Sequence, residues 1–191
     1  MLVLFVFLSQ SSRSEAQELH TNKQIFYSIA YSGNNIWNPG ADFAYNRILG
    51  RKDNPSAGKS NSLEMLWRAN TGFYLDPGSH GALYGNAGFG FRKPGGRVVF
   101  TFDLSPAGIY RSFLTETYLV RVDEVGKVFL PGNFFYSPGA GFDIGRKLAG
   151  THHSEIFGRI QVITLIPYNT YLMPLIHIQI GLRFAAKGGK L

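Results

Sequence analysis

The chain has 191 residues, enough for one domain with a sizeable core. Charged residues make up only 16% of it, aromatic residues reach 15%, and the formal net charge is +7. No apolar run approaches the ~18 residues of a membrane-spanning helix, and the absence of cysteine excludes disulfides, thiolate metal sites and cysteine catalysis.

An apolar run occupies residues 2–8, and small and polar residues follow it. This pattern predicts a secretory signal, with small residues at Ser14 and Ala16 before an expected cleavage point after Ala16. The basic residue that usually precedes such a run is absent, so either the natural start lies further upstream or the segment is a buried N-terminal strand. The expected organisation is a signal peptide at 1–16, a short segment at 17–23, one folded domain at 24–186 and a tail at 187–191.

From residue 25 onward, short segments alternate between apolar and polar residues with a period of two. Such alternation is typical of half-buried strands. No stretch with the 3.6-residue period of an amphipathic helix competes for a long part of the chain. In chain order, strands are predicted at 25–32, 41–49, 63–75, 82–92, 97–110, 134–146, 155–166 and 175–184.

Most connections between these strands carry turn-forming residues, such as DPGSHG at 76–81, KPGG at 93–96 and PYN at 167–169. Consecutive strands joined in this way are most simply antiparallel neighbours. Eight of them can close into a barrel, which removes the unpaired edges of the sheet. The domain at 24–186 is therefore predicted to be all-β, a closed antiparallel up-and-down β-barrel of eight strands.

The two faces of the predicted strands set the orientation of this barrel. One face carries large apolar and aromatic residues, such as Ile176, Ile178 and Ile180 in the last strand, and the other carries small polar residues with isolated charges. Small residues and paired ions suit a narrow lumen, and large apolar residues suit contact with lipid, so we expect a transmembrane barrel. The polar residues expected to form a network in the lumen are Glu64, Arg68, Asp103, Asp143, Glu155, Arg159, His177 and Arg183.

We expect this network to be structural and not the lining of an open pore, because eight strands leave a lumen mostly filled by side chains. The alternative is a soluble, exported, lipocalin-like barrel that binds a ligand in an apolar interior. The Gly-x-Trp pattern usual near the first strand of such proteins is only approached by NNIWNPG at 34–40.

The basic residues gather at one rim of the predicted barrel. An even number of antiparallel strands places both termini and every second connection at the same rim, and the longest connection, at 115–132, falls on the opposite rim. Longer connections are typical of the outer face of outer-membrane barrels, although the loop at 50–60 is longer than a periplasmic turn usually is. Thirteen of the 19 basic residues are assigned to the rim with the termini, namely Lys23, Arg47, Arg51, Lys52, Lys59, Arg92, Lys93, Arg97, Arg146, Lys147, Arg183, Lys187 and Lys190.

The last predicted strand contains a polar residue at Gln179, a glycine at Gly181 and an aromatic residue at Phe184. This pattern resembles the C-terminal insertion signal of outer-membrane barrels, although Ala186 is a weak final position. Over roughly residues 24–186 the chain resembles small eight-stranded outer-membrane proteins of the OmpA-barrel and OmpX class. The segment at 69–93 is similar to uncharacterised outer-membrane proteins of Bacteroidota. The resemblance implies a membrane protein of a Gram-negative cell envelope, located in the cell outer membrane.

The best catalytic candidate is the sequence THHSE at 151–155. His152 and Ser154 have the His-x-Ser spacing of PagL-like lipid A deacylases, in which a histidine is the base for a serine nucleophile. The downstream glutamate that orients the histidine in that family is missing, and the motif falls on the rim with the termini. His152 and His153 point apart on a strand and lack a third ligand. We therefore expect no catalytic residues, no metal site and no cofactor.

The sequence favours a non-enzymatic integral outer-membrane protein with a structural, adhesive or complex-accessory role. Its expected partners are outer-membrane lipids, the barrel-assembly machinery that inserts such proteins, and a larger outer-membrane complex. Because the chain is predicted to be exported, the basic rim indicates anionic lipid head groups or periplasmic partners and not nucleic acid. The soluble barrel is the second hypothesis, and the lipid A deacylase is the third.

Overall fold

The computed structural model describes residues 24–34, 38–53, 62–77, 80–114, 118–121, 124–129, 131–148, 154–169 and 171–186. The predicted signal peptide at 1–16, the segment at 17–23 and the tail at 187–191 lie outside these ranges. The described residues contain no helix that is long and apolar enough to cross a membrane.

The described residues form eleven strands. All eight predicted strands are present among them, and most extend further at one or both ends than predicted. Ser137 and Pro138 interrupt the sixth predicted strand and divide it into β8 and β9, since proline has no amide hydrogen to donate to a neighbour. The strands are β1 Ile25–Asn34, β2 Gly40–Asp53, β3 Ser62–Asp76, β4 His80–Gly95, β5 Val98–Leu114, β6 Tyr118–Arg121, β7 Glu124–Lys127, β8 Phe134–Tyr136, β9 Gly139–Lys147, β10 Ser154–Tyr168 and β11 Tyr171–Ala185.

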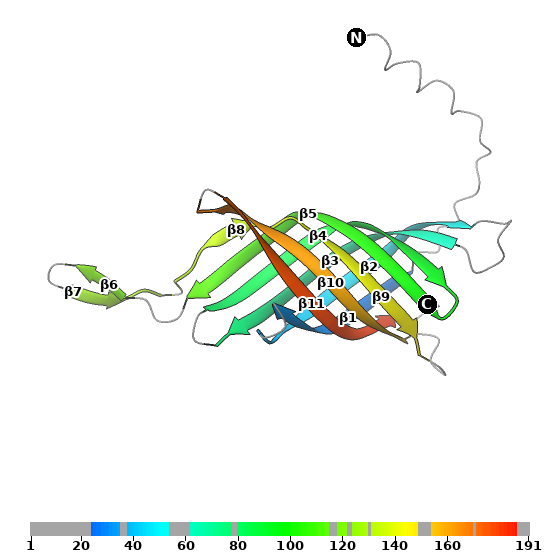
Figure 1. Ribbon diagram of the computed structural model, residues 1–191, viewed down its shortest axis with the longest axis horizontal. Helices are drawn as coiled ribbons and strands as arrows, with labels where there is room; N and C mark the ends of the chain where they lie inside the picture. The colour runs from blue at the N-terminus through cyan, green and yellow to red at the C-terminus, as the bar shows by residue number, and fades with distance from the viewer. Residues whose placement is uncertain are drawn as a thin grey trace, which may run out of the picture.

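Hydrogen bonding joins nine of these strands, all except β6 and β7, into a closed antiparallel ring. Strands β1 to β5 pair in sequence order, and β11 pairs with both β10 and β1, which closes the sheet on itself. Strands β8 and β9 share one place in the ring, between β5 and β10. Figure 1 shows the strands tilted around a cylinder, with the C-terminus at one end. The predicted eight-stranded up-and-down barrel is confirmed.

The β6–β7 hairpin was not predicted from the sequence. It lies within the longest predicted connection and forms a separate two-stranded sheet. In Figure 1 it projects beyond the end of the barrel opposite the C-terminus. We call that end the outer mouth and the other end the terminal end.

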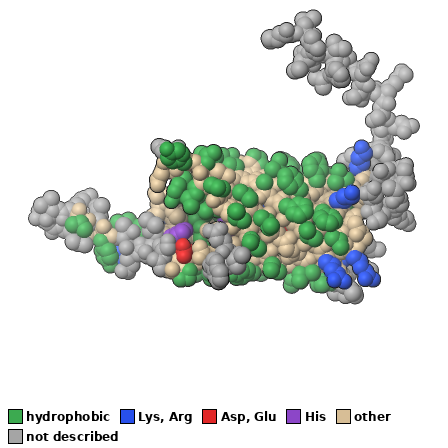
Figure 2. Space-filling view, in the orientation of Figure 1, with side chains coloured by type: hydrophobic (Ala, Val, Ile, Leu, Met, Phe, Trp, Pro, Cys, Tyr) green, Lys and Arg blue, Asp and Glu red, His purple; other side chains and the backbone are tan. Residues whose placement is uncertain are grey.

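The apolar face of the strands lies on the outside of the barrel. Ile180 is 62% exposed and Phe89 57% exposed, whereas Arg68 and Asp103 are fully buried in the lumen. Figure 2 shows hydrophobic side chains covering the visible flank of the cylinder. A continuous apolar exterior around a charged interior is the arrangement of a barrel that spans a membrane. The soluble lipocalin-like alternative is therefore wrong, because it requires an apolar interior.

Aromatic side chains reinforce the exterior near the terminal end. The rings of Tyr27, Tyr45 and Trp67 lie on adjacent strands, and successive ring centroids are 5.7 Å apart in edge-to-face contact. Aromatic girdles of this kind are typical of the interfaces between a membrane barrel and the lipid head groups.

The basic residues at the terminal end divide into two groups. Figure 2 shows Lys and Arg side chains gathered on the exterior at that end. Arg92 and Arg183, which were counted with this rim from the sequence, point into the lumen, where they are 1% and 0% exposed; a lumen position was expected for Arg183 but not for Arg92. Lys23, Lys59, Lys187 and Lys190 lie outside the described residues. The side chains that do line this exterior are those of Arg47, Lys52, Lys93, Arg97 and Arg146. Arg51 and Lys147 lie opposite Glu64 and Glu155 on the lumen face of the rim.

Candidate functional site

A small apolar cluster lies among the charged side chains towards the terminal end of the lumen. Phe26, Ile48 and Leu66 form a buried cluster there. The guanidinium carbons of Arg92 and Arg183 lie 5.1 and 5.4 Å from the centroid of the Phe26 ring, close enough for cation–π attraction. The apolar cluster therefore packs directly against the charged side chains of the lumen.

A continuous chain of ion pairs crosses the lumen next to this cluster. Arg92 donates to Glu64 and to Glu155, each over 2.9 Å. Arg183 donates to the second oxygen of Glu155 over 2.5 Å and to Asp143 over 3.1 Å. Each carboxylate thus faces a guanidinium group, which is the condition for burying charge without a large loss of stability.

Arg159 extends this chain to the other side of the lumen. It contacts Asp143 over 3.4 Å and holds both oxygens of Asp103 over 2.5 and 2.9 Å, a bidentate geometry that fixes the planar guanidinium group. Arg68 is held more loosely, because its contacts with Asp42 and Asp143 are both 3.9 Å long.

The structure brings seven of the eight residues predicted for the lumen network into one cluster. Only His177 stands apart, further towards the outer mouth, where its ring makes edge contacts with Tyr74 and Tyr84 at centroid distances of 5.6 and 4.8 Å. Its two ring nitrogens have no hydrogen-bond partner among the described residues.

Three charged residues that contact the network were missed in the selection of lumen charges from the sequence. Arg51, at the rim, lies 3.7 Å from Glu64. Arg92 links Glu64 to the rest of the chain, and Asp42 accepts hydrogen bonds from Asn70 over 2.8 Å and Tyr84 over 3.2 Å. The strand period contained the signal for Arg92, because it lies an even number of residues after the inward-facing Asn86. Its position close to a turn led to its assignment to the rim.

Between the ion pairs and the outer mouth, the lumen is filled by amides and hydroxyls. Gln179 donates to Gln161 over 3.1 Å, and the hydroxyls of Ser32 and Tyr84 are 3.0 Å apart. Asn86 donates to the carbonyl oxygen of Ser137 over 2.6 Å. These neutral groups bridge the gap between the charged layer and the aromatic groups nearer the mouth.

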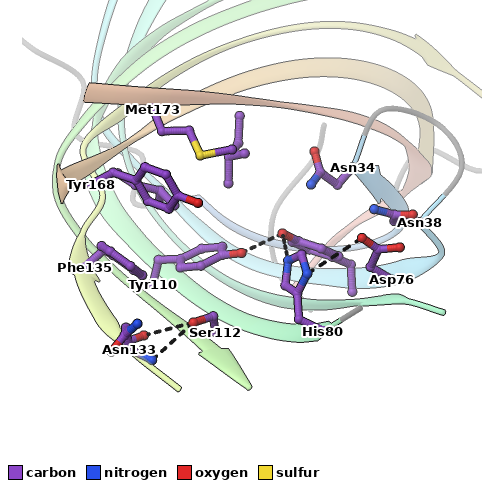
Figure 3. A pocket seen from close by; sticks show the side chains of 13 residues that line it. Asn34, Asn38, Asp76, His80, Tyr110, Ser112, Asn133, Phe135, Tyr168 and Met173 are labelled. Atoms are coloured by element: carbon purple, nitrogen blue, oxygen red, sulfur yellow. Dashed lines mark hydrogen bonds and ion pairs between the residues drawn. The ribbon is translucent and has the colours of Figure 1, made fainter. Parts of the chain in front are cut away.

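A cavity of about 450 Å³ opens at the outer mouth. Its floor includes Tyr74, whose hydroxyl lies 2.6 Å from the hydroxyl of Tyr110 and 3.3 Å from Nε2 of His80. His80 in turn lies 3.7 Å from the carboxylate of Asp76. Figure 3 shows this linked row of side chains across the base of the cavity.

The catalytic candidate at 151–155 is only partly described, since His152 and His153 lie outside the described residues. Ser154 is half-buried at the start of β10, at the terminal end. Glu155 is committed to Arg92 and Arg183 inside the lumen. No group of three side chains able to hold a metal ion occurs in the described part of the chain.

The three residues of the proposed insertion signal occupy both faces of β11. Gln179 is buried in the lumen, and Phe184 is 42% exposed on the exterior. Gly181 pairs with Ala30 on β1, and a side chain at this position would collide with the backbone of β1. Close packing of β11 against β1 is therefore one reason for glycine here.

Comparison with solved structures shows likeness in fold at very low sequence identity. The N-terminal β-barrel domain of OprF from Pseudomonas aeruginosa aligns with a TM-score of 0.50 and 8% identity, over 86% of this chain and 98% of that one. Ail from Yersinia pestis, solved with the heparin analogue sucrose octasulfate, gives 0.49 and 9% over 85% and 95%. Neisserial surface protein A gives 0.47 and 9% over 84% and 94%.

No protein-family model matches the sequence, and neither does any curated protein. The fold rests on the closed ring of eight strand positions, the apolar exterior and the charged lumen, and the alignment with the OprF barrel agrees with it. The chain is therefore a small, closed, eight-stranded antiparallel β-barrel of the type that spans outer membranes.

Proposed function

We propose that this protein is a non-enzymatic integral outer-membrane barrel that conducts no solute and acts through its outer mouth in a structural, adhesive or complex-accessory role. The observation that carries the proposal is the uninterrupted chain of ion pairs across the lumen. A pathway for solute would have to part the contacts of Arg92, Arg159 and Arg183, all of which are buried. The lumen therefore acts as packing, and recognition is left to the ends of the barrel.

Electrical recording tests this proposal directly. Purified protein inserted into planar lipid bilayers is expected to give no large or stable conductance. Heat-modifiable migration on gels verifies that the recorded protein is folded. A steady porin-like current from folded protein would contradict the sealed lumen.

The apolar exterior supports a location in the outer membrane, and insertion by the barrel-assembly machinery is proposed from the pattern of Gln179, Gly181 and Phe184. Fractionation of cells is expected to recover the protein with outer-membrane markers, in a form that resists extraction by salt. Recovery in the soluble periplasm would contradict this location. Co-purification in mild detergent would identify a larger complex.

Two features support a non-enzymatic role over lipid A deacylation. Ser154 lies at the terminal end of the barrel, and Glu155 is occupied by two arginines. The variant Ser154→Ala is expected to leave the acylation pattern of lipid A unchanged in cells that express equal amounts of either protein. A change of acylation that follows this single hydroxyl would establish an enzyme instead.

A further inference from the structure

The cavity at the outer mouth has two chemically different walls. Figure 3 shows the rings of Tyr110, Phe135 and Tyr168 on one side and the polar side chains of Asn34 and Asp76 on the opposite side. The aromatic side is continuous, since the centroid of Phe135 lies 6.1 Å from that of Tyr110 and 5.7 Å from that of Tyr168. A ligand that fits both walls must present an apolar face and a polar edge.

The size of the cavity limits the ligand. A volume of about 450 Å³ lies within the roughly 300–1,000 Å³ of typical small-molecule sites. Tyr74 lies at its base, and beneath it the lumen is packed by His177 and Tyr84. The ligand therefore enters from the outer mouth, and a folded protein domain cannot occupy the cavity.

Asn34 gives the polar wall an unused hydrogen-bonding group. The residue is only 5% exposed, and its side-chain carbonyl oxygen has no hydrogen-bond partner among the described residues. A buried acceptor left without a donor is unfavourable, because it has lost its hydrogen bonds to water. An O–H or N–H group of a ligand would remove that penalty.

The charge of the wall selects against anions. The carboxylate of Asp76 lies at the cavity, next to His80, and accepts hydrogen bonds but cannot donate them when ionised. No lysine or arginine is among the described residues that line the cavity. A phosphate or sulfate group would meet a carboxylate and amides without a cationic side chain that is permanently charged.

From these observations we propose that the outer mouth binds a neutral saccharide of one or two pyranose rings. One face of such a ring consists of C–H bonds and packs on aromatic rings, while its edge carries hydroxyls that donate to Asn34 and Asp76. Amphipathic aromatic rings and amides that both donate and accept match this chemistry. The inference rests on the proposed function, because it gives the outer mouth its ligand class.

Saturation-transfer NMR on the full chain in lipid nanodiscs tests the inference. The probes are maltose, cellobiose and N,N′-diacetylchitobiose as neutral sugars, sucrose octasulfate as an anion and octanoate as an acyl chain. Nanodiscs are used because glucoside detergents would compete for the cavity. At least one neutral disaccharide is expected to receive saturation, most strongly at the C–H protons of one ring face.

Two tyrosines at the same turn provide matched variants. Tyr168 lines the cavity, whereas Tyr171 is 78% exposed outside it. Tyr168→Ala is expected to reduce the signal at least several-fold, and Tyr171→Ala is expected to retain it. Asn34→Ser provides a second test. It removes the unpartnered amide oxygen while leaving the aromatic wall in place, and it is expected to weaken the saturation signal.

The inference is overturned if none of the three disaccharides receives saturation, or if Tyr168→Ala and Tyr171→Ala behave alike. It is also overturned if sucrose octasulfate or octanoate competes successfully at the same residues while the disaccharides do not. These outcomes are separate from those for the proposed function, because a sealed barrel without a sugar site gives no conductance and no saturation. A conducting barrel with a sugar site gives both conductance and saturation transfer.

Discussion

Arg92 connects Glu64 to the rest of the lumen network, and it separates that carboxylate from Glu155. Replacing it with methionine keeps most of the side-chain volume but leaves two buried carboxylates without their shared cation. Removing one partner of a buried ion pair typically costs about 3–5 kcal/mol. We expect Arg92→Met to lower the free energy of unfolding by about this amount, measured by urea titration in zwitterionic micelles.

Lys93→Met is the matched control for this variant. The two positions are adjacent on β4, but Lys93 is exposed on the exterior. Substitutions at such surface positions usually change stability by within about 0.5 kcal/mol. Equal losses for Arg92→Met and Lys93→Met would show that the lumen pairs contribute nothing specific.

Gly141 leaves room for the guanidinium group of Arg159. A methyl group at Gly141 would overlap atoms of that group, which Asp103 holds by two hydrogen bonds. Gly141→Ala is therefore expected to lower the free energy of unfolding by about 1–3 kcal/mol, the usual cost of overpacking. The same urea titration measures it.

Gly158, on the neighbouring strand, is the control for Gly141. It faces outward, and a methyl group there would meet no atom of the described residues within 4 Å. Gly158→Ala is expected to be neutral or to stabilise by up to about 1 kcal/mol, because alanine reduces the freedom of the unfolded chain. A loss of stability at Gly158 as large as that at Gly141 would mean that the preference of strands for one residue over the other, and not the collision with Arg159, sets the cost.

At the scale of whole strands, alternation was sufficient to predict the ring. Each strand separates lipid from lumen, so a shift of one residue would move every large apolar side chain into the interior. That constraint does not apply to the β6–β7 hairpin, whose Tyr118 and Val120 are 51% and 74% exposed. A strand face exposed in this way is under no such constraint, and alternation did not predict the hairpin.

The same alternation predicted which residues enter the lumen but not how they pair. Glu155, on β10, meets Arg183 on the neighbouring strand but also reaches Arg92 on β4. The second contact crosses the interior of the barrel and depends on the stagger of strands that are far apart in the ring. The mouth cavity is subject to the same limit, because residues such as Asn34, Tyr74 and Phe135 meet there only after closure.

Strand β11 allows the insertion signal to be separated from ordinary lipid contact. Phe184 on β11 and Phe142 on β9 are both outward phenylalanines, 42% and 44% exposed. If Phe184 is also recognised during assembly, Phe184→Ala lowers the folded, heat-modifiable fraction in cells several-fold more than Phe142→Ala does. Unfolding of the two purified variants in micelles is expected to differ little. Equal folded fractions in cells would contradict a special role for Phe184.

Across the whole molecule, opposite charges are partitioned between the interior and the exterior. Among described side chains, the carboxylates lie in the lumen except for that of Asp76, which lies at the outer mouth. Most of the described exterior cations gather at the terminal end. Lumen arginines neutralise lumen acids, so the excess positive charge of the chain remains on the exterior, facing the lipid head groups at that end.

This partition predicts a preference for anionic lipid at the terminal end. Each basic residue near an anionic membrane surface contributes about 1 kcal/mol, so the triple variant Lys93→Gln, Arg97→Gln, Arg146→Gln should remove up to about 3 kcal/mol of that preference. The measurement compares urea unfolding in vesicles of phosphatidylcholine with and without phosphatidylglycerol. The unmodified protein should be more stable in the anionic vesicles, and the difference should shrink in the triple variant.

The difference in stability between the two kinds of vesicle should also shrink at high salt, since screening shortens the reach of these charges to about 3 Å at 1 M. Equal stability of the unmodified protein in both vesicles would show that the exterior cations have no lipid preference, and they would then be free to bind a periplasmic partner.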